Sequence, residues 1–150
     1  MTKKLILRGA LTAIVTPFTK SGAVDFPAFR RLLKRQIDAG ISGIVVCGST
    51  GEAATLNDKE YAAVVKCAVD TVGGRVPVIA GAGSNNTARA IMLSKLAESC
   101  GVDGLLHVTP FYNKPTPNGL VAHFKAIAEA VKLPIILYNV PSRTNVNMQP

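Results

Sequence analysis

Five short apolar runs recur along the chain at intervals of roughly 30 residues, the spacing of repeating strand–helix units. The runs cover residues 11–15, 44–47, 76–80, 105–108 and 135–138. Valine, isoleucine and leucine dominate them, and polar positions are few. Such nearly continuous hydrophobic runs are typical of strands that are buried on both faces of a parallel sheet. The pattern therefore predicts five parallel strands.

Segments with helical periodicity separate these runs. The clearest begins after Asn57, which has the capping-box spacing to Glu60, and Gly73 follows its last apolar position as a stop signal. The helix before it is expected to start after Asp25 and to end at Gly40. Two more helices are predicted over about 87–99 and 116–131.

Strands that alternate with helices place the chain in the α/β class. A doubly wound sheet of the flavodoxin type can be complete with five strands, but it gathers its binding residues at one switch point. Here the chemically rich loops follow the second, fourth and fifth strands, as in a barrel whose strand ends form a ring. A (β/α)8 TIM barrel needs eight units in about 250 residues. Residues 1–150 are therefore predicted to be one partial TIM-barrel domain, the N-terminal five βα units.

The net charge of +8 does not indicate nucleic-acid binding. Much of the positive charge falls on Arg30, Arg31, Lys34 and Arg35, which interleave with apolar positions of the first helix. No aromatic side chains stand among these charges to stack on bases. The pattern is typical of a solvated helix face, so no nucleic-acid partner is expected.

Membrane association and metal binding are not expected either. No apolar segment approaches the ~18 residues of a membrane span, and the basic N-terminal residues 1–8 hold too short an apolar stretch for a secretory signal. Cys47, Cys67 and Cys100 lack the spacing of a disulfide framework or zinc ribbon. No Asp, Glu and His grouping has metal-ligand spacing. We expect a cytoplasmic protein without metal or cofactor.

The richest candidate chemistry lies at the fifth strand, which ends in Tyr138 and leads into a tight turn carrying Arg143. A phenol at the mouth of a buried strand can move protons, and a guanidinium can hold a carboxylate. Tyr138 could also be a core aromatic whose hydroxyl has a backbone partner. Arg143 and the rigid Val-Pro sequence between them favour the functional interpretation.

Two further loops carry candidate groups. In the loop after the second strand, Gly48 lets the backbone approach a ligand, and the hydroxyls of Ser49 and Thr50 can bind a small carboxylate; an ordinary turn is the alternative. The stiff, proline-rich loop of Tyr112 is suited to packing against another subunit, although a plain surface loop fits as well. His107, His123 and Cys47 are interpreted as structural.

Five segments together resemble the dihydrodipicolinate synthase family, within the pyruvate-dependent, Schiff-base class I aldolases. They are residues 13–18 (AIVTPF), 48–52 (GSTGE), 77–81 (PVIAG), 109–115 (TPFYNKP) and 137–144 (LYNVPSRT). The resemblance covers essentially the whole chain. The first two segments are shared across the superfamily, and the last two together are specific to the synthases.

The resemblance implies that a lysine forms a Schiff base with pyruvate, and that the resulting enamine attacks L-aspartate-4-semialdehyde on the route to diaminopimelate and lysine. By position, Tyr138 matches the general acid/base, Ser49 its hydroxyl relay, and Tyr112 the relay member from a neighbouring subunit. Thr50 matches the residue that holds the pyruvate carboxylate, and Arg143 the one that receives the semialdehyde. Family members are usually homotetramers without a cofactor.

The family's Schiff-base lysine belongs to the sixth strand, so it is expected beyond residue 150, and the 150-residue chain alone is expected to be inactive. Ser49 stands where synthases commonly have threonine and is more typical of the N-acetylneuraminate lyase branch, whereas Arg143 favours the synthases. The alternatives are N-acetylneuraminate lyase, a 2-keto-3-deoxy sugar acid aldolase of the same superfamily, or a non-catalytic scaffold fragment.

The resemblance also implies a lysine-inhibition site, which this chain has altered. Asn85 keeps the amide of that site. Arg89 stands on the carboxylate position, Phe111 replaces a tyrosine, and Tyr61 replaces a histidine. A guanidinium facing the ligand's ammonium group would repel it. We therefore expect an enzyme that is insensitive to lysine.

Overall fold

The computed structural model describes residues 5–149, so residues 1–4 of the basic N-terminal segment and Pro150 lie outside the described part. Its centre is a five-stranded parallel sheet in the order β1-β2-β3-β4-β5. The strands are β1 (Leu11–Ala13), β2 (Gly43–Val46), β3 (Val78–Gly81), β4 (Gly104–Val108) and β5 (Ile135–Tyr138). All five predicted strands are confirmed; β5 has the predicted ends, and the ends of the other four are shifted by at most two residues.

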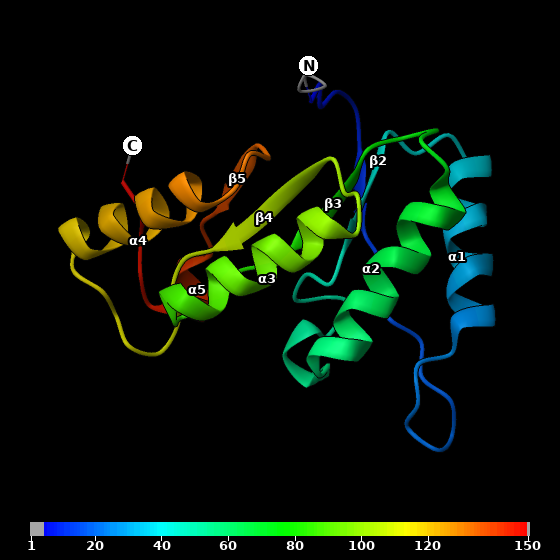
Figure 1. Ribbon diagram of the computed structural model, residues 1–150, viewed down its shortest axis with the longest axis horizontal. Helices are drawn as coiled ribbons and strands as arrows, with labels where there is room; N and C mark the ends of the chain where they lie inside the picture. The colour runs from blue at the N-terminus through cyan, green and yellow to red at the C-terminus, as the bar shows by residue number, and fades with distance from the viewer. Residues whose placement is uncertain (1–4, 150) are drawn as a thin grey trace.

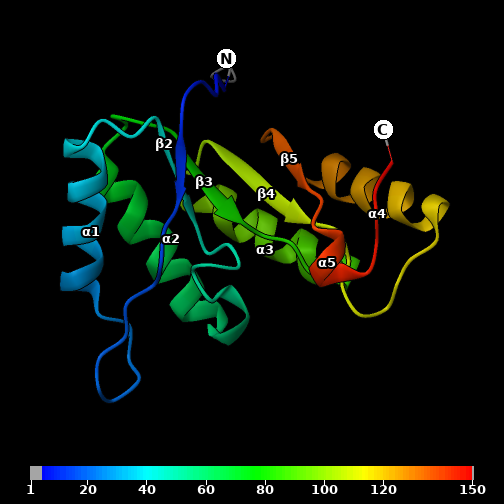
Figure 2. The same ribbon diagram turned by 180° about the vertical axis from the view of Figure 1, so that it is seen from behind.

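Four long helices lie together on one face of this sheet, as the front and back views show (Figures 1 and 2). They are α1 (Phe26–Asp38), α2 (Asp58–Val72), α3 (Thr87–Ser99) and α4 (Pro117–Ala130). A doubly wound sheet would have a reversed strand order and helices on both faces. The sequential order and the single helical layer are instead those of part of a TIM barrel, which confirms the predicted fold class.

The helix boundaries follow from capping side chains. The carboxylate of Asp25 accepts the backbone N–H of Ala28 at 2.9 Å at the start of α1. At the start of α2, Asn57 and Glu60 form the predicted capping box, in which each side chain accepts the other residue's backbone N–H. Gly73 ends α2 in the left-handed conformation, which a glycine adopts without steric strain.

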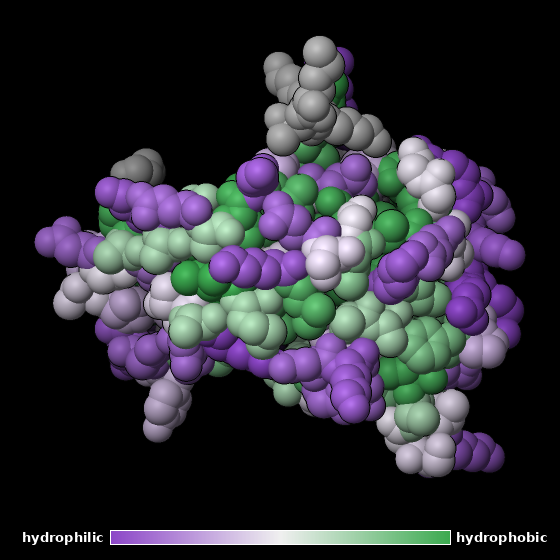
Figure 3. Space-filling model, in the orientation of Figure 1, coloured by the Kyte–Doolittle hydropathy of each residue, from purple (hydrophilic) through white to green (hydrophobic). Residues whose placement is uncertain are grey.

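The hydrophobic core lies between the sheet and its helices, with α1 supplying the fully buried Phe29 and Leu33. The charged α1 residues Arg30, Arg31 and Lys34 remain exposed, as expected for a solvated helix face. Hydrophilic side chains accordingly gather on the α1 side of the molecule, whereas apolar ones lie over the middle of the helical layer (Figure 3). Within residues 5–149, no helix has the length and apolar character needed to cross a bilayer.

Within residues 5–149, both edges of the sheet are open, since β1 pairs only with β2 and β5 only with β4. Val15, just past β1, is 46% exposed, and Leu137 in β5 is 44% exposed. Beyond β5, the predicted tight turn is wrong: residues Pro141–Thr144 form a one-turn helix, α5. Arg143 therefore sits in a helical turn, which begins at the proline because its ring already has a helical φ.

Candidate active site

A cavity of about 400 Å³ opens at the carboxyl ends of the strands. Gly48 and Ser49 line it from the loop after β2, Gly83 from the loop after β3, and Tyr138 from the end of β5. The carboxyl ends of parallel strands meet at one edge of the sheet, where TIM-barrel enzymes have their active sites. The fold therefore brings a phenol and a hydroxyl, 89 residues apart in the sequence, to one cavity.

The other predicted substrate and relay residues lie outside the lining of this cavity. Thr50 follows Ser49 but is exposed, and Arg143 is exposed on α5. Tyr112 is 90% exposed on its loop, where its φ of 72° is one that L-residues rarely adopt. Its phenol thus projects from the surface, as a residue that reaches into a neighbouring subunit would.

Close backbone contacts shape the cavity floor. A Cβ atom on Gly81 would lie 2.2 Å from the carbonyl oxygen of Cys47, so no larger residue fits there. Cys47 itself is buried with a φ of 51°. Burial is the main cause that raises the pKa of its thiol to about 12. The thiol stays protonated at neutral pH, which agrees with its interpretation as a structural residue.

Tyr61, which we expected at a ligand site, is a buried residue of α2 and 2% exposed. Its hydroxyl donates a 2.9 Å hydrogen bond to the carbonyl oxygen of Gly81 at the end of β3. Burial raises the pKa of the phenol, so it stays neutral. Tyr61 lines the cavity, and its hydrogen bond fixes α2 to the sheet.

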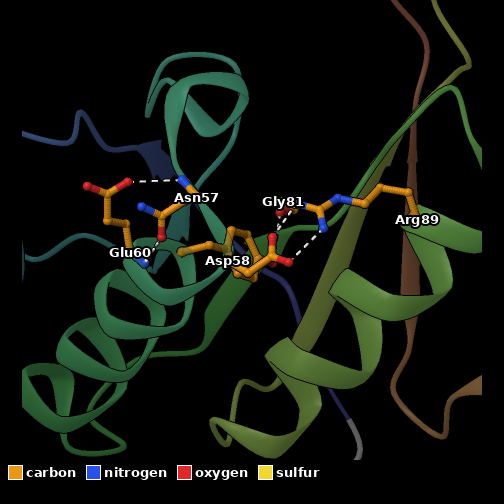
Figure 4. A network of polar contacts seen from close by, with 6 residues as sticks. Asn57, Asp58, Glu60, Gly81 and Arg89 are labelled. Carbon is orange, nitrogen blue, oxygen red and sulfur yellow. Dashed lines mark hydrogen bonds and ion pairs between the residues drawn. The ribbon is translucent and has the colours of Figure 1, made fainter.

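Arg89 does not present a free guanidinium to the cavity that it lines. From α3 it reaches across to the start of α2, where Nη1 donates to Asp58 Oδ2 at 2.9 Å and Nη2 donates to Oδ1 (Figure 4). The hydrogen bond from Arg89 lowers the pKa of the Asp58 carboxyl. The sequence analysis missed Asp58, because the two residues are 31 positions apart and no local spacing links them.

Of the two remaining residues of that predicted site, Phe111 lines the cavity and Asn85 does not. Phe111 lines the cavity and is 40% exposed. Asn85 is absent from the lining, and its backbone carbonyl accepts a hydrogen bond from the Asn113 side chain at 3.1 Å. This contact joins the loop after β3 to the Tyr112 loop.

The two histidines form buried contacts between β4, α3 and α4. Ser94 Oγ lies 3.1 Å from His107 Nε2, and Thr87 Oγ1 lies 2.9 Å from His123 Nδ1. Burial, and then the neighbouring His123, lowers the pKa of His107 to about 4. Both histidines therefore pack as neutral side chains, as their structural interpretation requires. Residues 5–149 contain no cluster of three or more potential metal ligands.

Three buried threonines next to the cavity loops were missed in the sequence analysis. The hydroxyl of Thr16 donates to the carbonyl oxygen of Gly51 at 2.7 Å, and that of Thr109 donates to the Thr144 hydroxyl at 3.2 Å. Thr16 and Thr109 follow strand ends and precede prolines, whereas Thr144 is the last residue of α5. A polar residue directly after an apolar run was the signal that could have revealed Thr16 and Thr109; Thr144 had no such signal.

A single helical layer on a sequentially ordered parallel sheet, with a cavity at the strand ends, is typical of the class of (β/α)8-barrel enzymes. The model of the Dihydrodipicolinate synthetase family matches residues 6–150. The chain therefore belongs to this family.

Individual relatives agree with this assignment. A 4-hydroxy-tetrahydrodipicolinate synthase of Maridesulfovibrio salexigens is 55% identical over 146 residues, which are 97% of this chain and 50% of the relative. The crystal structure of a chloride-inhibited dihydrodipicolinate synthase from Acinetobacter baumannii, complexed with pyruvate, matches with a TM-score of 0.94 and 49% identity, over 95% of this chain and 49% of that one.

A third structure, dihydrodipicolinate synthase from Cyanidioschyzon merolae with lysine bound, matches with a TM-score of 0.89 and 45% identity. That match covers 92% of this chain and 47% of the other. The chain thus spans about half the length of the relatives it matches.

Proposed function

We propose that these residues are the N-terminal five βα units of a 4-hydroxy-tetrahydrodipicolinate synthase, which condenses pyruvate with L-aspartate-4-semialdehyde in the first committed step of diaminopimelate and lysine synthesis. The observation that carries this proposal is that Tyr138 and Ser49 line one cavity at the strand ends. The pyruvate in the similar Acinetobacter baumannii enzyme supports the choice of substrate. The Schiff-base lysine would follow residue 150, on the next strand.

In this proposal the phenol of Tyr138 transfers protons while pyruvate forms its imine and enamine. A phenol is a weak acid, so it needs hydroxyl partners to pass its proton on. Ser49 supplies one hydroxyl from the loop after β2, in the same cavity. Tyr112 of a second copy supplies the other, which suits a side chain that is 90% exposed.

The two carboxylates of the substrates would be bound by separate loops. Thr50, with Gly48 allowing close approach of the backbone, would hold the carboxylate of pyruvate. Arg143 on α5 would hold that of the semialdehyde, since a guanidinium can donate two parallel hydrogen bonds to a carboxylate. Its exposed position suits a residue that captures a charged substrate at the cavity mouth.

A homo-oligomer, and specifically a tetramer, is part of this proposal, because the relay needs Tyr112 from a neighbouring copy. The cytoplasm is the proposed compartment. Cys47, Cys67 and Cys100 are all free thiols, which suits the reducing conditions there. No nucleic-acid or membrane partner and no cofactor enter the proposed reaction.

The proposal is tested on the full-length protein with pyruvate and aspartate semialdehyde. Condensation is expected, and borohydride added with pyruvate should leave a reduced pyruvyl adduct on one lysine. The 150-residue chain is the matched control, and neither turnover nor an adduct is expected from it, because the imine-forming lysine lies outside it. Cleavage of N-acetylneuraminate without semialdehyde turnover would favour the lyase alternative, and no activity in the full-length protein would favour the scaffold alternative.

A further inference from the structure

The sequence Val-Thr-Pro-Phe occurs twice, at residues 15–18 and 108–111. In both copies it stands at the carboxyl end of a strand, after β1 and at the end of β4. Both threonines are buried, with Thr16 3% and Thr109 0% exposed. A residue before proline is restricted to extended conformations, so the backbone at each threonine is confined to one region.

Thr16 links the end of β1 to the loop after the neighbouring strand β2. Its hydroxyl donates a 2.7 Å hydrogen bond to the carbonyl oxygen of Gly51. Gly51 is also pressed against β1, since a Cβ atom there would lie 3.1 Å from the carbonyl oxygen of Ile14. Gly51 directly follows Ser49 and Thr50, so this bond holds the loop that carries both groups.

Thr109 makes the corresponding link from β4 to the segment after the neighbouring strand β5. Its hydroxyl donates to the hydroxyl of Thr144, which directly follows Arg143. The Thr144 oxygen also accepts the N–H of Val146 at 3.3 Å, and its hydroxyl has two carbonyl oxygens as acceptors, that of Val140 at 3.2 Å and that of Val146 at 3.1 Å. One hydroxyl can accept two hydrogen bonds and donate one, so Thr144 is fully satisfied and joins both ends of α5.

The backbone of Thr109 has a second partner. Its N–H donates to the carbonyl oxygen of Tyr138 at 3.1 Å, so the position of the phenol's backbone does not depend on the threonine side chain. Removing the hydroxyl of Thr109 therefore affects α5 and leaves this anchor of Tyr138 in place.

We propose that Thr16 and Thr109 are a repeated pair of positioning residues, each fixing the substrate-binding loop of the next strand: Thr16 the pyruvate loop, and Thr109 the semialdehyde loop. This inference rests on the proposed function for the identity of the two substrates. The two threonines of the repeated Val-Thr-Pro-Phe motif take no direct part in the proposed reaction, so this positioning role is additional to it. The two roles are separable, because the links lie on different strand pairs, β1–β2 and β4–β5.

The test uses the full-length protein and the variants Thr16→Val and Thr109→Val, which keep the shape and remove the hydroxyl. Thr16→Val should raise the KM for pyruvate about tenfold, and Thr109→Val that for the semialdehyde about tenfold, since each loses one buried hydrogen bond that orders a binding loop. In Thr109→Val, kcat should stay within about threefold, because Tyr138 keeps its backbone anchor. The variants Thr16→Ser and Thr109→Ser should restore both constants.

Thr71→Val is the matched control, since its hydroxyl lies 3.9 Å from Cys67 Sγ within α2, away from the loops, and no change in either KM is expected. Should a valine variant fail to fold, Thr16→Ala and Thr109→Ala serve in its place. Equal changes in both KM values, no change in either, or serine variants that behave like valine would overturn the proposal.

Hydrogen exchange gives a second readout that does not depend on the reaction. Exchange of backbone amides should become faster over residues 48–52 in Thr16→Val and over residues 139–146 in Thr109→Val. Each variant should leave exchange in the other segment unchanged. If the wild-type protein turns over neither substrate, the proposed function fails while exchange still tests the two links. Unchanged exchange in both segments would show that the hydroxyls position nothing.

Discussion

Arg89 and Asp58 form a two-point ion pair that joins the first turn of α3 to the first residue of α2. It replaces the free guanidinium that the sequence pattern had indicated. The pair borders the cavity through Arg89, so the carboxylate of Asp58 is already engaged by a cation of the same chain.

We predict that the full-length enzyme is insensitive to lysine, with half-inhibition above about a millimolar, an affinity weaker than roughly 4 kcal/mol. A ligand's ammonium group would have to displace Arg89 from Asp58, and the displaced guanidinium would repel it. The measurement is initial rate across a lysine titration.

The variant Arg89→Glu reverses the charge at the cavity and leaves Asp58 without its cation, so it should gain lysine sensitivity. Lys95→Glu, an equal charge change at an exposed position of the same helix, is the control and should not. Sub-millimolar inhibition of the wild-type enzyme would mean that the ion pair opens readily and that the site is intact.

Tyr138→Phe should lower kcat by ~10²–10⁴-fold in the full-length protein, the usual cost of losing a general acid/base. Borohydride trapping with pyruvate should slow as well, because imine formation needs the same proton transfers. Stopped-flow or quenched trapping separates the two steps. A variant as fast as wild type in both would remove the phenol from the mechanism.

Arg143→Ala should raise the KM for the semialdehyde more than tenfold, since a charged hydrogen bond contributes about 1.5–3 kcal/mol. The KM for pyruvate and the rate of imine trapping should not change. Arg143→Lys should recover part of the loss, because lysine keeps the charge but not the paired donors. Equal effects on both substrates would argue against a role confined to the semialdehyde.

Folding stability should fall as the pH drops from about 6.5 toward 4. In the folded state burial holds the pKa of His107 at about 4, whereas an unfolded histidine titrates near 6.5. Between these values the unfolded chain binds a proton that the folded chain does not, so stability is lost at up to about 1.4 kcal/mol per pH unit. Above pH 7 the group contributes no pH dependence.

The variant His107→Leu should flatten this slope. In this variant Ser94 keeps a hydrogen-bond partner, because the Ser94 hydroxyl donates to the Ala90 carbonyl oxygen at 2.6 Å. Urea unfolding of the wild type and of His107→Leu, at several pH values between 7 and 5, gives the unfolding free energy of each. The titration of other groups cancels in the difference between the two free energies. Parallel pH profiles would show that His107 is not the group responsible.

Several features could be derived from the sequence because they depend on local interactions. The apolar runs and the capping residues Asp25, Asn57 and Gly73 predicted strands and helix ends within one or two residues, since each acts within one turn of its own position. The family motifs predicted Ser49 and Tyr138 as site residues, and because these stand just past β2 and at the end of β5, they lie at one edge of the parallel sheet and line one cavity.

Other features were decided only by the tertiary structure. The partner of Arg89, the buried role of Tyr61, and the links of Thr16 and Thr109 all join residues that are 20 to 35 positions apart. Such contacts depend on which helix faces and strand ends meet after packing, and no sequence spacing encodes that meeting. Local patterns determined the elements and the chemistry at their ends, while packing decided which of those groups stay free to act and which are held by a neighbour.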